Sequence, residues 1–485
     1  MMFNYKLIIK IMSILMVLNG IFMSICLPFS WYFGGEDFGA LLGSALIAIS
    51  LGTVMWLLTR NSINKELRKR EGYLVVTIGW LVMSLIGTLP YMLSGEITNF
   101  TDAFFETLSG FSTTGATILE DIESVSKGIL LWRSMSQWIG GMGIIVLTVA
   151  ILPILGIGGM QLFVAEAPGI SPDKFQPRIK ETAKRLWIIY IGFTGLELIF
   201  LMVGDMTFFD ALNHSLTTMA SGGFSTKNSS IAYYDSAYID FIIVMFMFLA
   251  GTNFTMIYFG LHGKLKKVFQ NQEFRAYGGF CLVITIFCTL GIWMNGDENL
   301  IDSFRYSIFQ VISVITTTGY ITKDYTAWTP LLTMLFFFLM FVGASAGSTA
   351  GGIKIIRHLI LVKNSFLEFN RQIHPSAILP LRLNGRTVNG EITFQILAFV
   401  MLYLTIFALG SLGMALLGVD LVTAMGAAAS CLGNVGPGIG SVGPVANFAH
   451  MPTVGKWILS LLMLLGRLEL FTVLILFTPF FWRKT

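Results

Sequence analysis

Charged residues are scarce in this chain. Only 12% of its 485 residues are Asp, Glu, Lys or Arg, which is about half the share found in ordinary soluble domains. Hydrophobic residues make up 55%, so a soluble fold of this composition would have too little polar surface to present to water. The scarcity of charge therefore excludes an ordinary soluble domain and predicts an integral membrane protein.

Cysteines and catalytic motifs are scarce as well. The four cysteines lack the spacing of metal ligands, so we expect no disulfide and no structural zinc. There is no phosphate-binding glycine motif between a strand and a helix, no His/Glu metal spacing and no nucleophile–base pair. These absences argue against an enzyme. We expect no organic cofactor and no nucleic-acid partner.

Long apolar runs dominate what is present. Stretches of about 20 apolar residues recur along the chain, and each is long enough to cross the ~30 Å hydrocarbon core as a helix. The hydropathy pattern predicts an all-α fold with ten such spans. They are 8–32, 38–59, 72–93, 129–156, 186–204, 238–260, 277–295, 328–352, 392–417 and 455–481.

The charged residues orient these spans. Basic residues gather at 60–70, 174–185, 264–275 and 363–386, after the second, fourth, sixth and eighth spans, and again at the C-terminal end. Acidic residues gather in opposite loops, at 120–123 and 297–302. Because basic loops remain in the cytoplasm, we expect both termini to be cytoplasmic.

Four shorter segments lie between spans, at 101–115, 208–223, 301–319 and 420–436. Each is too short to cross the bilayer and too apolar for an ordinary loop. The orientation places both ends of each segment outside, so each must dip into the membrane and return. Irregular backbone at that depth is tolerated where it lines a cavity. Four such dips predict four helix–pore loop–helix repeats around one central pore.

Each of the four segments ends in small polar residues and a glycine. A glycine accepts a positive φ and can turn carbonyl groups toward an axis. Carbonyl oxygens arranged around an axis can replace the hydration shell of a monovalent cation. The preceding half-helices would direct their partly negative C-terminal ends at the same site. The pattern predicts a cation pore.

Three stretches carry a resemblance to a known family. They are FFETLSGFSTTGAT at 104–117, NHSLTTMASGGFST at 213–226 and TTTGY at 316–320. The sequence resembles the TrkH-type subunits of the Trk/Ktr/HKT superfamily of potassium transporters, over essentially the whole chain. The resemblance implies an N-terminal helix pair at 1–70 followed by pore repeats at 71–165, 166–262, 263–365 and 366–485.

The resemblance also places the potassium-binding positions, three in each repeat. They are Thr113, Thr114 and Gly115; Ser221, Gly222 and Gly223; Thr317, Thr318 and Gly319; and Asn434, Val435 and Gly436. In some plant members of the superfamily a serine replaces the first filter glycine and accompanies sodium permeation, so Gly115 favours potassium. No repeat keeps the Thr-Val-Gly-Tyr-Gly pattern of channels, and we expect looser selectivity.

A run of small residues interrupts the eighth span. It consists of Gly343, Ala344, Ser345, Ala346, Gly347, Ser348, Thr349, Ala350, Gly351 and Gly352. One interpretation is a tight helix–helix contact. The other is an unwound loop below the filter, and the resemblance implies the second, an intramembrane gating loop.

Two basic residues accompany this run. Arg467 lies near the middle of the last predicted span, where a charge costs roughly 3 kcal/mol unless it faces the protein interior. It either forms a structural ion pair with Glu469 or Glu197, or, as the family implies, faces the pore as part of the gate. Lys354 is either a membrane-surface anchor or a link from the loop to a cytoplasmic partner.

The resemblance finally implies potassium uptake across the bacterial cytoplasmic (inner) membrane, with potassium as the substrate. It implies a homodimer and a cytoplasmic TrkA-like nucleotide-binding regulatory subunit. A proton- or sodium-coupled symporter remains the alternative to a gated pore. Proton coupling would need an essential carboxylate within the membrane, and Glu197 is the best candidate.

Overall fold

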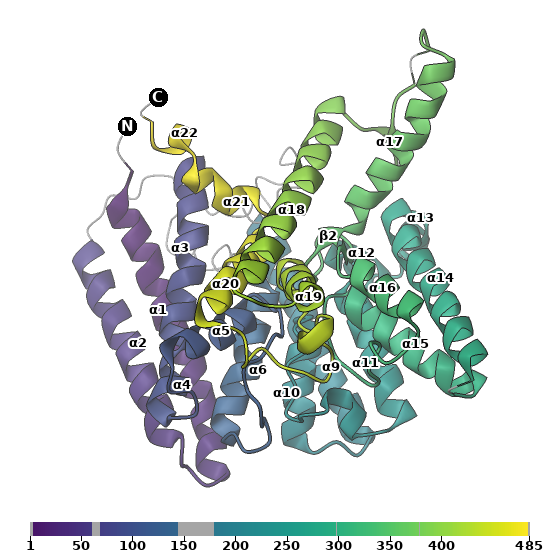
Figure 1. Ribbon diagram of the computed structural model, residues 1–485. Helices are drawn as coiled ribbons and strands as arrows, with labels where there is room; N and C mark the ends of the chain where they lie inside the picture. Colours follow the sequence, from purple (N-terminus) through teal and green to yellow (C-terminus); the bar gives the residue numbers. More distant parts are fainter. Residues whose placement is uncertain (1–2, 61–67, 144–178, 297, 378, 484–485) are drawn as a thin grey trace.

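The computed structural model describes residues 3–60, 68–143, 179–296, 298–377 and 379–483. In these residues the fold is almost entirely helical (Figure 1). An N-terminal pair, α1 (Tyr5–Tyr32) and α2 (Phe38–Thr59), packs side by side along one flank. Glycine permits the contact, because a Cβ on Gly52 would lie 2.7 Å from the Ser13 carbonyl oxygen.

Six apolar helices among the described residues are long enough to cross a membrane without a break. Three are α1, α2 and the nearly continuous pair α3–α4 (Lys69–Gly87 and Leu89–Ser94). The others are α9 (Ile179–Val203), α14 (Gln272–Asn295) and α18 (Gly390–Leu416). All six fall on predicted spans. Many lipid-length helices packed together make this a multi-pass membrane protein.

Two predicted spans are broken helices. The span at 238–260 consists of α11 (Ala237–Ala250) and α12 (Phe254–Leu261), bent by 108°. The last span consists of α20 (Thr453–Arg467) and a segment formed by α21 (Phe471–Leu474) and the 3₁₀ turn η4 (Ile475–Phe477), bent by 110°. The expectation of continuous helices is wrong at both places. Arg467 therefore ends a helix and does not lie in the middle of one.

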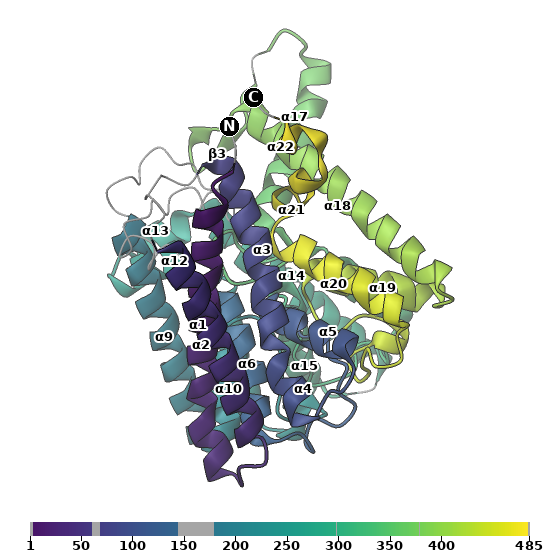
Figure 2. The same ribbon diagram turned by 90° about the vertical axis from the view of Figure 1, so that its left-hand side faces the viewer.

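The eighth predicted span is short. Its helix, α16 (Pro330–Leu339), has 10 residues and is followed by non-helical chain. Two parallel two-residue strands, β1 (Val342–Gly343) and β2 (Ile353–Lys354), close the ends of this stretch. The chain continues as α17 (Ile355–Ile373), which extends toward the end of the molecule where both termini lie (Figures 1 and 2). The second half of the span predicted at 129–156 and the boundary predicted at 165/166 lie outside the described residues.

Four helices of 12 to 16 residues occupy the four predicted short segments. They are α5 (Phe100–Phe111), α10 (Phe208–Met219), α15 (Leu300–Ile315) and α19 (Leu421–Gly433). Around them stand α6 (Lys127–Gly141) and the longer helices. The remaining elements are α13 (Leu265–Gln270), α22 (Pro479–Trp482), the antiparallel strands β3 (Arg382–Leu383) and β4 (Arg386–Thr387), and the 3₁₀ turns η2 (Ser230–Tyr233) and η3 (Gly440–Val442).

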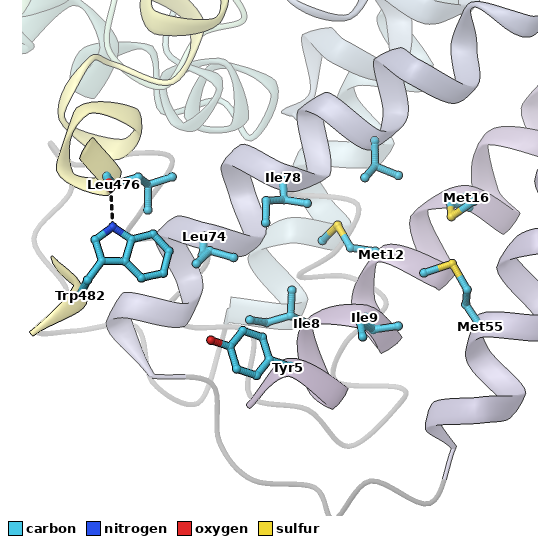
Figure 3. Close-up of a pocket in the computed structure, with 11 residues that line it drawn as sticks. Tyr5, Ile8, Ile9, Met12, Met16, Met55, Leu74, Ile78, Leu476 and Trp482 are labelled. Carbon is cyan, nitrogen blue, oxygen red and sulfur yellow. Dashed lines mark hydrogen bonds between the residues drawn. The ribbon is translucent and has the colours of Figure 1, made fainter. Parts of the chain in front are cut away.

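An apolar cavity of about 510 Å³ lies near the two termini (Figure 3). Its lining comes from α1, α2, α3 and the C-terminal segment: Tyr5, Ile8, Ile9, Met12, Met16, Met55, Leu74, Ile78, Val82, Leu476 and Trp482. The Trp482 indole N–H donates to the Leu476 carbonyl. This cavity contains none of the predicted site residues.

Candidate functional site

The four short helices begin in the same way. At each N-terminus a side-chain oxygen accepts a hydrogen bond from a backbone N–H of the first turn, as a helix cap requires. The capping residues are Asn99, Thr207, Asn299 and Asp420. The backbone N–H of Thr423 lowers the pKa of the Asp420 carboxyl, so this cap remains charged. In the loop after α5, a hydrogen bond from Asn228 lowers the pKa of Asp121.

The four helices also end in the same way, with a residue in the left-handed backbone region. The φ values are 54° at Thr113, 55° at Ser221, 56° at Thr317 and 54° at Asn434. The next backbone N–H donates to a carbonyl five residues earlier, from Thr114 to Ser109, Gly222 to Thr217, Thr318 to Ser313 and Val435 to Ser430, at 2.8–2.9 Å. This is the Schellman closure of a helix. The repeated bond supports the register in which the four glycines were aligned.

Each closure leads into one of the aligned glycines. Their φ values are 80° at Gly115, 73° at Gly223, 77° at Gly319 and 99° at Gly436. All four lie in the region that L-residues with a Cβ avoid. The four segments therefore share a positive φ at two equivalent positions. The first position holds a non-glycine residue, and the second holds the aligned glycine.

The four glycines define a closed ring. A Cβ on Gly115 would lie 2.2 Å from the Gly222 carbonyl oxygen, and one on Gly223 would lie 1.8 Å from that of Thr318. A Cβ on Gly319 would lie 2.1 Å from the Val435 oxygen, and one on Gly436 would lie 2.6 Å from that of Thr114. Each segment thus touches the next in chain order, and the fourth touches the first. The predicted filter residues of all four repeats meet around one axis.

Partial negative charges are concentrated at this ring. The C-terminal ends of the four short helices, each carrying a partial negative charge, reach the ring together with its carbonyl oxygens. The side chains of Thr113, Thr114, Ser221, Thr317 and Asn434 are fully buried. Such a site offers oxygen ligands of partial charge to a cation of low charge density.

Behind the ring lies a buried ion pair that the sequence analysis missed. Arg133 of α6 binds Glu106 of α5 at 2.6 Å, and both side chains are almost inaccessible. The same carboxylate accepts hydrogen bonds from the Thr117 hydroxyl and the Ile118 backbone N–H. A charge inside the span predicted at 129–156 was the available signal for Arg133, but hydropathy does not indicate which partner such a charge meets.

The small-residue run is a loop, as the gating interpretation requires, and not a helix–helix contact. Strands β1 and β2 hold its two ends together. The backbone N–H of Ser345 donates to the Gly251 carbonyl at 3.0 Å, and that of Thr349 donates to the Ala250 carbonyl at 3.3 Å. These bonds use the carbonyls freed where α11 ends, which explains why the predicted span 238–260 breaks there.

The loop contacts three of the four ring segments. The Thr349 hydroxyl lies 2.7 Å from that of Ser221, and the Gly351 N–H donates to the Thr317 hydroxyl at 2.7 Å. A Cβ on Gly351 would lie 2.6 Å from the Gly433 carbonyl oxygen, beside Asn434. The loop therefore lies against the first ring residue of the second, third and fourth segments.

Arg467 connects the loop to helix α6 of the first repeat. Its guanidinium donates to the Thr349 carbonyl at 2.8 Å and to the carbonyls of Gly140 and Gly141 in α6 at 2.6 and 3.1 Å. Glu469, one of the two partners considered under the structural interpretation, binds Arg357 instead. The ammonium of Lys354 donates to the Ala350 carbonyl, so Lys354 stabilises the loop from within.

Glu273 is a second residue that the sequence analysis missed. It lies at the start of α14, and its carboxylate accepts a hydrogen bond from the loop's Ala346 N–H at 2.6 Å. Its side chain is buried. A glutamate close to the expected membrane boundary was the available signal, but the loop that it contacts lies 73 residues away in the sequence.

Membrane-length helices around a ring of four glycine-bearing turns define a multi-pass membrane protein organised about a central axis. The family model described as TrkH, cation transport protein, matches residues 40–290 and 280–484. The chain belongs to the TrkH family of cation transport proteins.

Relatives match over nearly the full length. The chain is 43% identical to the Trk system potassium uptake protein TrkH of Salmonella typhimurium, covering 90% of this chain and 91% of the relative. It is 39% identical to the protein of the same name from Halomonas elongata, covering 99% and 100%. The crystal structure of the potassium transporter TrkH from Vibrio parahaemolyticus superposes with a TM-score of 0.89 at 35% identity, covering 99% and 100%.

Proposed function

We propose that this chain takes up potassium across the bacterial cytoplasmic membrane, and that the ring is its selectivity filter. The observation that carries the proposal is the closed ring of four glycines, each beside a carbonyl of the next segment. The proteins of Salmonella typhimurium and Halomonas elongata that match the chain are named potassium uptake proteins. Potassium is the substrate, and the twelve filter residues replace its water shell with backbone and hydroxyl oxygens.

The proposed architecture follows from the ring. The pore repeats at 71–165, 166–262, 263–365 and 366–485 each contribute one short helix that dips in from the outer side. The chain crosses the membrane ten times, with the helix pair at 1–70 on the flank and both termini cytoplasmic. Both termini lie at one end of the molecule, which supports an even number of crossings (Figure 2).

The gate in this proposal is the loop at 343–352 together with Lys354 and Arg467. The loop lies against three ring residues, and Arg467 bonds it to α6. A guanidinium below a cation site opposes the passage of cations through Coulomb repulsion. The contacts support a closed state in which the loop covers the ring.

The proposed assembly is a homodimer regulated by a cytoplasmic TrkA-like nucleotide-binding subunit. This part rests on the resemblance to TrkH-type subunits. Helix α17 follows directly from the loop and extends to the end where the termini lie, so a partner bound there could pull on the loop.

Cation flux into liposomes tests the proposed function. Purified protein is reconstituted, and the influx of potassium, rubidium, sodium and lithium is compared at a clamped voltage. We expect potassium and rubidium flux well above that of sodium and lithium. Equal flux for all four cations would overturn the proposed selectivity. A complete absence of cation flux would overturn the proposed pore.

A proton-coupled symporter is the second candidate, and Glu197 of α9 favours it. Its side chain is fully buried, and neither carboxylate oxygen has a hydrogen bond of standard geometry within the described residues. The substitution Glu197→Gln tests this alternative. Loss of potassium accumulation driven by a proton gradient would support coupling, whereas unchanged flux with unchanged pH dependence would remove it.

A further inference from the structure

Helix α6, in the first proposed repeat, contacts the filter segment of the second repeat. Gln137 of α6 is fully buried. Its amide nitrogen donates to the Gly222 carbonyl at 2.6 Å, and its amide oxygen accepts from the Phe224 N–H at 3.1 Å. The two bonds fix the orientation of the amide, since nitrogen donates and oxygen accepts. A single side chain thus brackets Gly223 from both sides.

A second side chain on the same face of α6 extends this contact. Arg133, one turn earlier, donates to the Ser225 carbonyl at 3.0 Å. Its guanidinium lies 3.5 Å from the centre of the Phe224 ring, and Glu106 holds it in place. Side chains of α6 therefore hold Gly222, Phe224 and Ser225, an arrangement that we name the α6 brace.

The α6 brace makes the ring unequal. Four carbonyl groups lie against a neighbouring glycine of the ring. They belong to Thr114, Gly222, Thr318 and Val435. Within the described part of the chain, Gly222 alone among these four has a side-chain donor on its oxygen. A donor attracts electron density from the carbonyl oxygen and also limits its movement. The Gly222 carbonyl is thus held by α6 in a way that the carbonyls of Thr114, Thr318 and Val435 are not in the described part of the chain.

We propose that Gln137 is a positioning residue that determines selectivity, because it keeps the Gly222 carbonyl from closing around a small cation. The inference rests on the proposed ion path through the ring. Sodium needs shorter oxygen contacts than potassium, so it gains when a carbonyl is free to move inward. Each hydrogen bond of this kind contributes of order 1 kcal/mol, and its loss reduces the potassium-to-sodium flux ratio about fivefold.

Two substitutions test the inference in the full-length protein. Gln137→Met keeps the length of the side chain and removes the amide donor and oxygen acceptor. Gln137→Glu keeps an oxygen for the Phe224 N–H and, when ionised, has no N–H for the Gly222 carbonyl. Ser134→Ala is the matched control, because Ser134 lies on the same helix and its hydroxyl donates to the Leu130 carbonyl of that helix.

The measurement is the ratio of potassium to sodium flux in liposomes at a clamped voltage, for wild type and the three variants. We expect the ratio to fall about fivefold in both Gln137 variants and to stay unchanged in Ser134→Ala. A purely structural Gln137 would reduce the flux of every cation equally, so unchanged ratios in the two Gln137 variants would overturn the inference. If Gln137→Met does not fold, the ratio in Gln137→Glu decides, measured at a pH at which the carboxylate is ionised. An unselective wild type would instead overturn the proposed filter.

Discussion

At the scale of single residues, three of the four left-handed non-glycine positions lie against the loop. An L-residue in this conformation costs roughly 1–2 kcal/mol, which a glycine would avoid. Three of the four side chains have contacts that glycine could not make. Ser221 contacts the Thr349 hydroxyl, Thr317 accepts from the Gly351 N–H, and Asn434 donates to the Met463 carbonyl. The strain is therefore retained at positions where the side chains bind neighbouring elements.

The substitution Gly223→Ala tests the ring at its tightest point. The added Cβ would lie 1.8 Å from the Thr318 carbonyl oxygen and would occupy a φ of 73°. We expect that selectivity between potassium and sodium is lost, because that carbonyl must move away. The flux ratio in liposomes measures the effect.

Gly195→Ala on α9 is the control for this substitution, because among the described residues no atom beyond its own stretch of helix lies within 4 Å of the added Cβ. The control variant should keep the wild-type ratio. A Gly223→Ala protein that folds and remains as selective as wild type would contradict the assignment of the ring.

Arg467 is predicted to hold the gate closed. In Arg467→Ala the carbonyls of Thr349, Gly140 and Gly141 lose a charged donor. We expect basal cation flux without any partner to rise about tenfold, which corresponds to ~1.4 kcal/mol of barrier. Arg371→Ala is the control, since Arg371 lies on the exposed part of α17 and binds Glu368 of the same helix. Equal basal flux in the two variants would remove Arg467 from the gate.

At the scale of elements, the loop is held mainly by hydrogen bonds to other elements, and less by hydrogen bonds between its own residues. Ala344 and Ala350 of the loop are buried among core side chains, and the rest of the loop is positioned by hydrogen bonds with α11, α14, α20 and the ring. Each bond contributes only about 0.5–1.5 kcal/mol, or up to ~3 kcal/mol with a charged partner. A loop attached in this way can be released without unfolding the helices around it.

Glu273 is predicted to act as a latch on this loop. Glu273→Ala removes the acceptor of the Ala346 N–H, and we expect basal flux to rise about tenfold because a charged hydrogen bond of ~1.5–3 kcal/mol is lost. Glu273→Gln keeps an acceptor oxygen and should raise the flux less. Both are measured as potassium influx into liposomes without a partner.

Glu391→Ala is the control for the latch, because Glu391 begins α18 in an exposed position. Its flux should equal that of wild type. If Glu273→Ala also behaves as wild type, the hydrogen bond to Ala346 is not part of the closed state.

At the scale of the whole molecule, the ring is the place where elements distant in sequence meet. Gly436 lies beside the Thr114 carbonyl, and Asn434 donates to the Thr114 hydroxyl 320 residues away. The ring therefore exists only in the folded chain. A cation bound there must stabilise the native state, because an unfolded chain offers no such site.

Thermal unfolding of the purified protein measures this linkage. At a concentration 100 times its dissociation constant, a bound cation adds ~2.7 kcal/mol to the free energy of unfolding. We expect a higher unfolding temperature in potassium than in lithium at equal ionic strength. Gly223→Ala should lose the difference, whereas Gly195→Ala should keep it. Identical unfolding temperatures in the two salts for wild type would contradict cation binding at the ring.

The amino-acid sequence by itself determined the class of protein, the four short helices and the register of the four glycines. These features depend on local chemistry: the length of apolar runs, a capping side chain before each short helix, and a glycine after it. Gly115, Gly223, Gly319 and Gly436 could be aligned because each repeat needs a positive φ two residues after the left-handed residue that closes its helix.

Only the tertiary structure decided where the spans break and which partners the buried charges have. Arg467 ends a helix and bonds to α6 and the loop, and Glu106 binds Arg133 of a different helix. Gln137 and Glu273 gained their roles in the same way. The physical reason is that a buried polar group must find a partner, and that partner depends on how distant helices pack, which hydropathy and spacing do not encode.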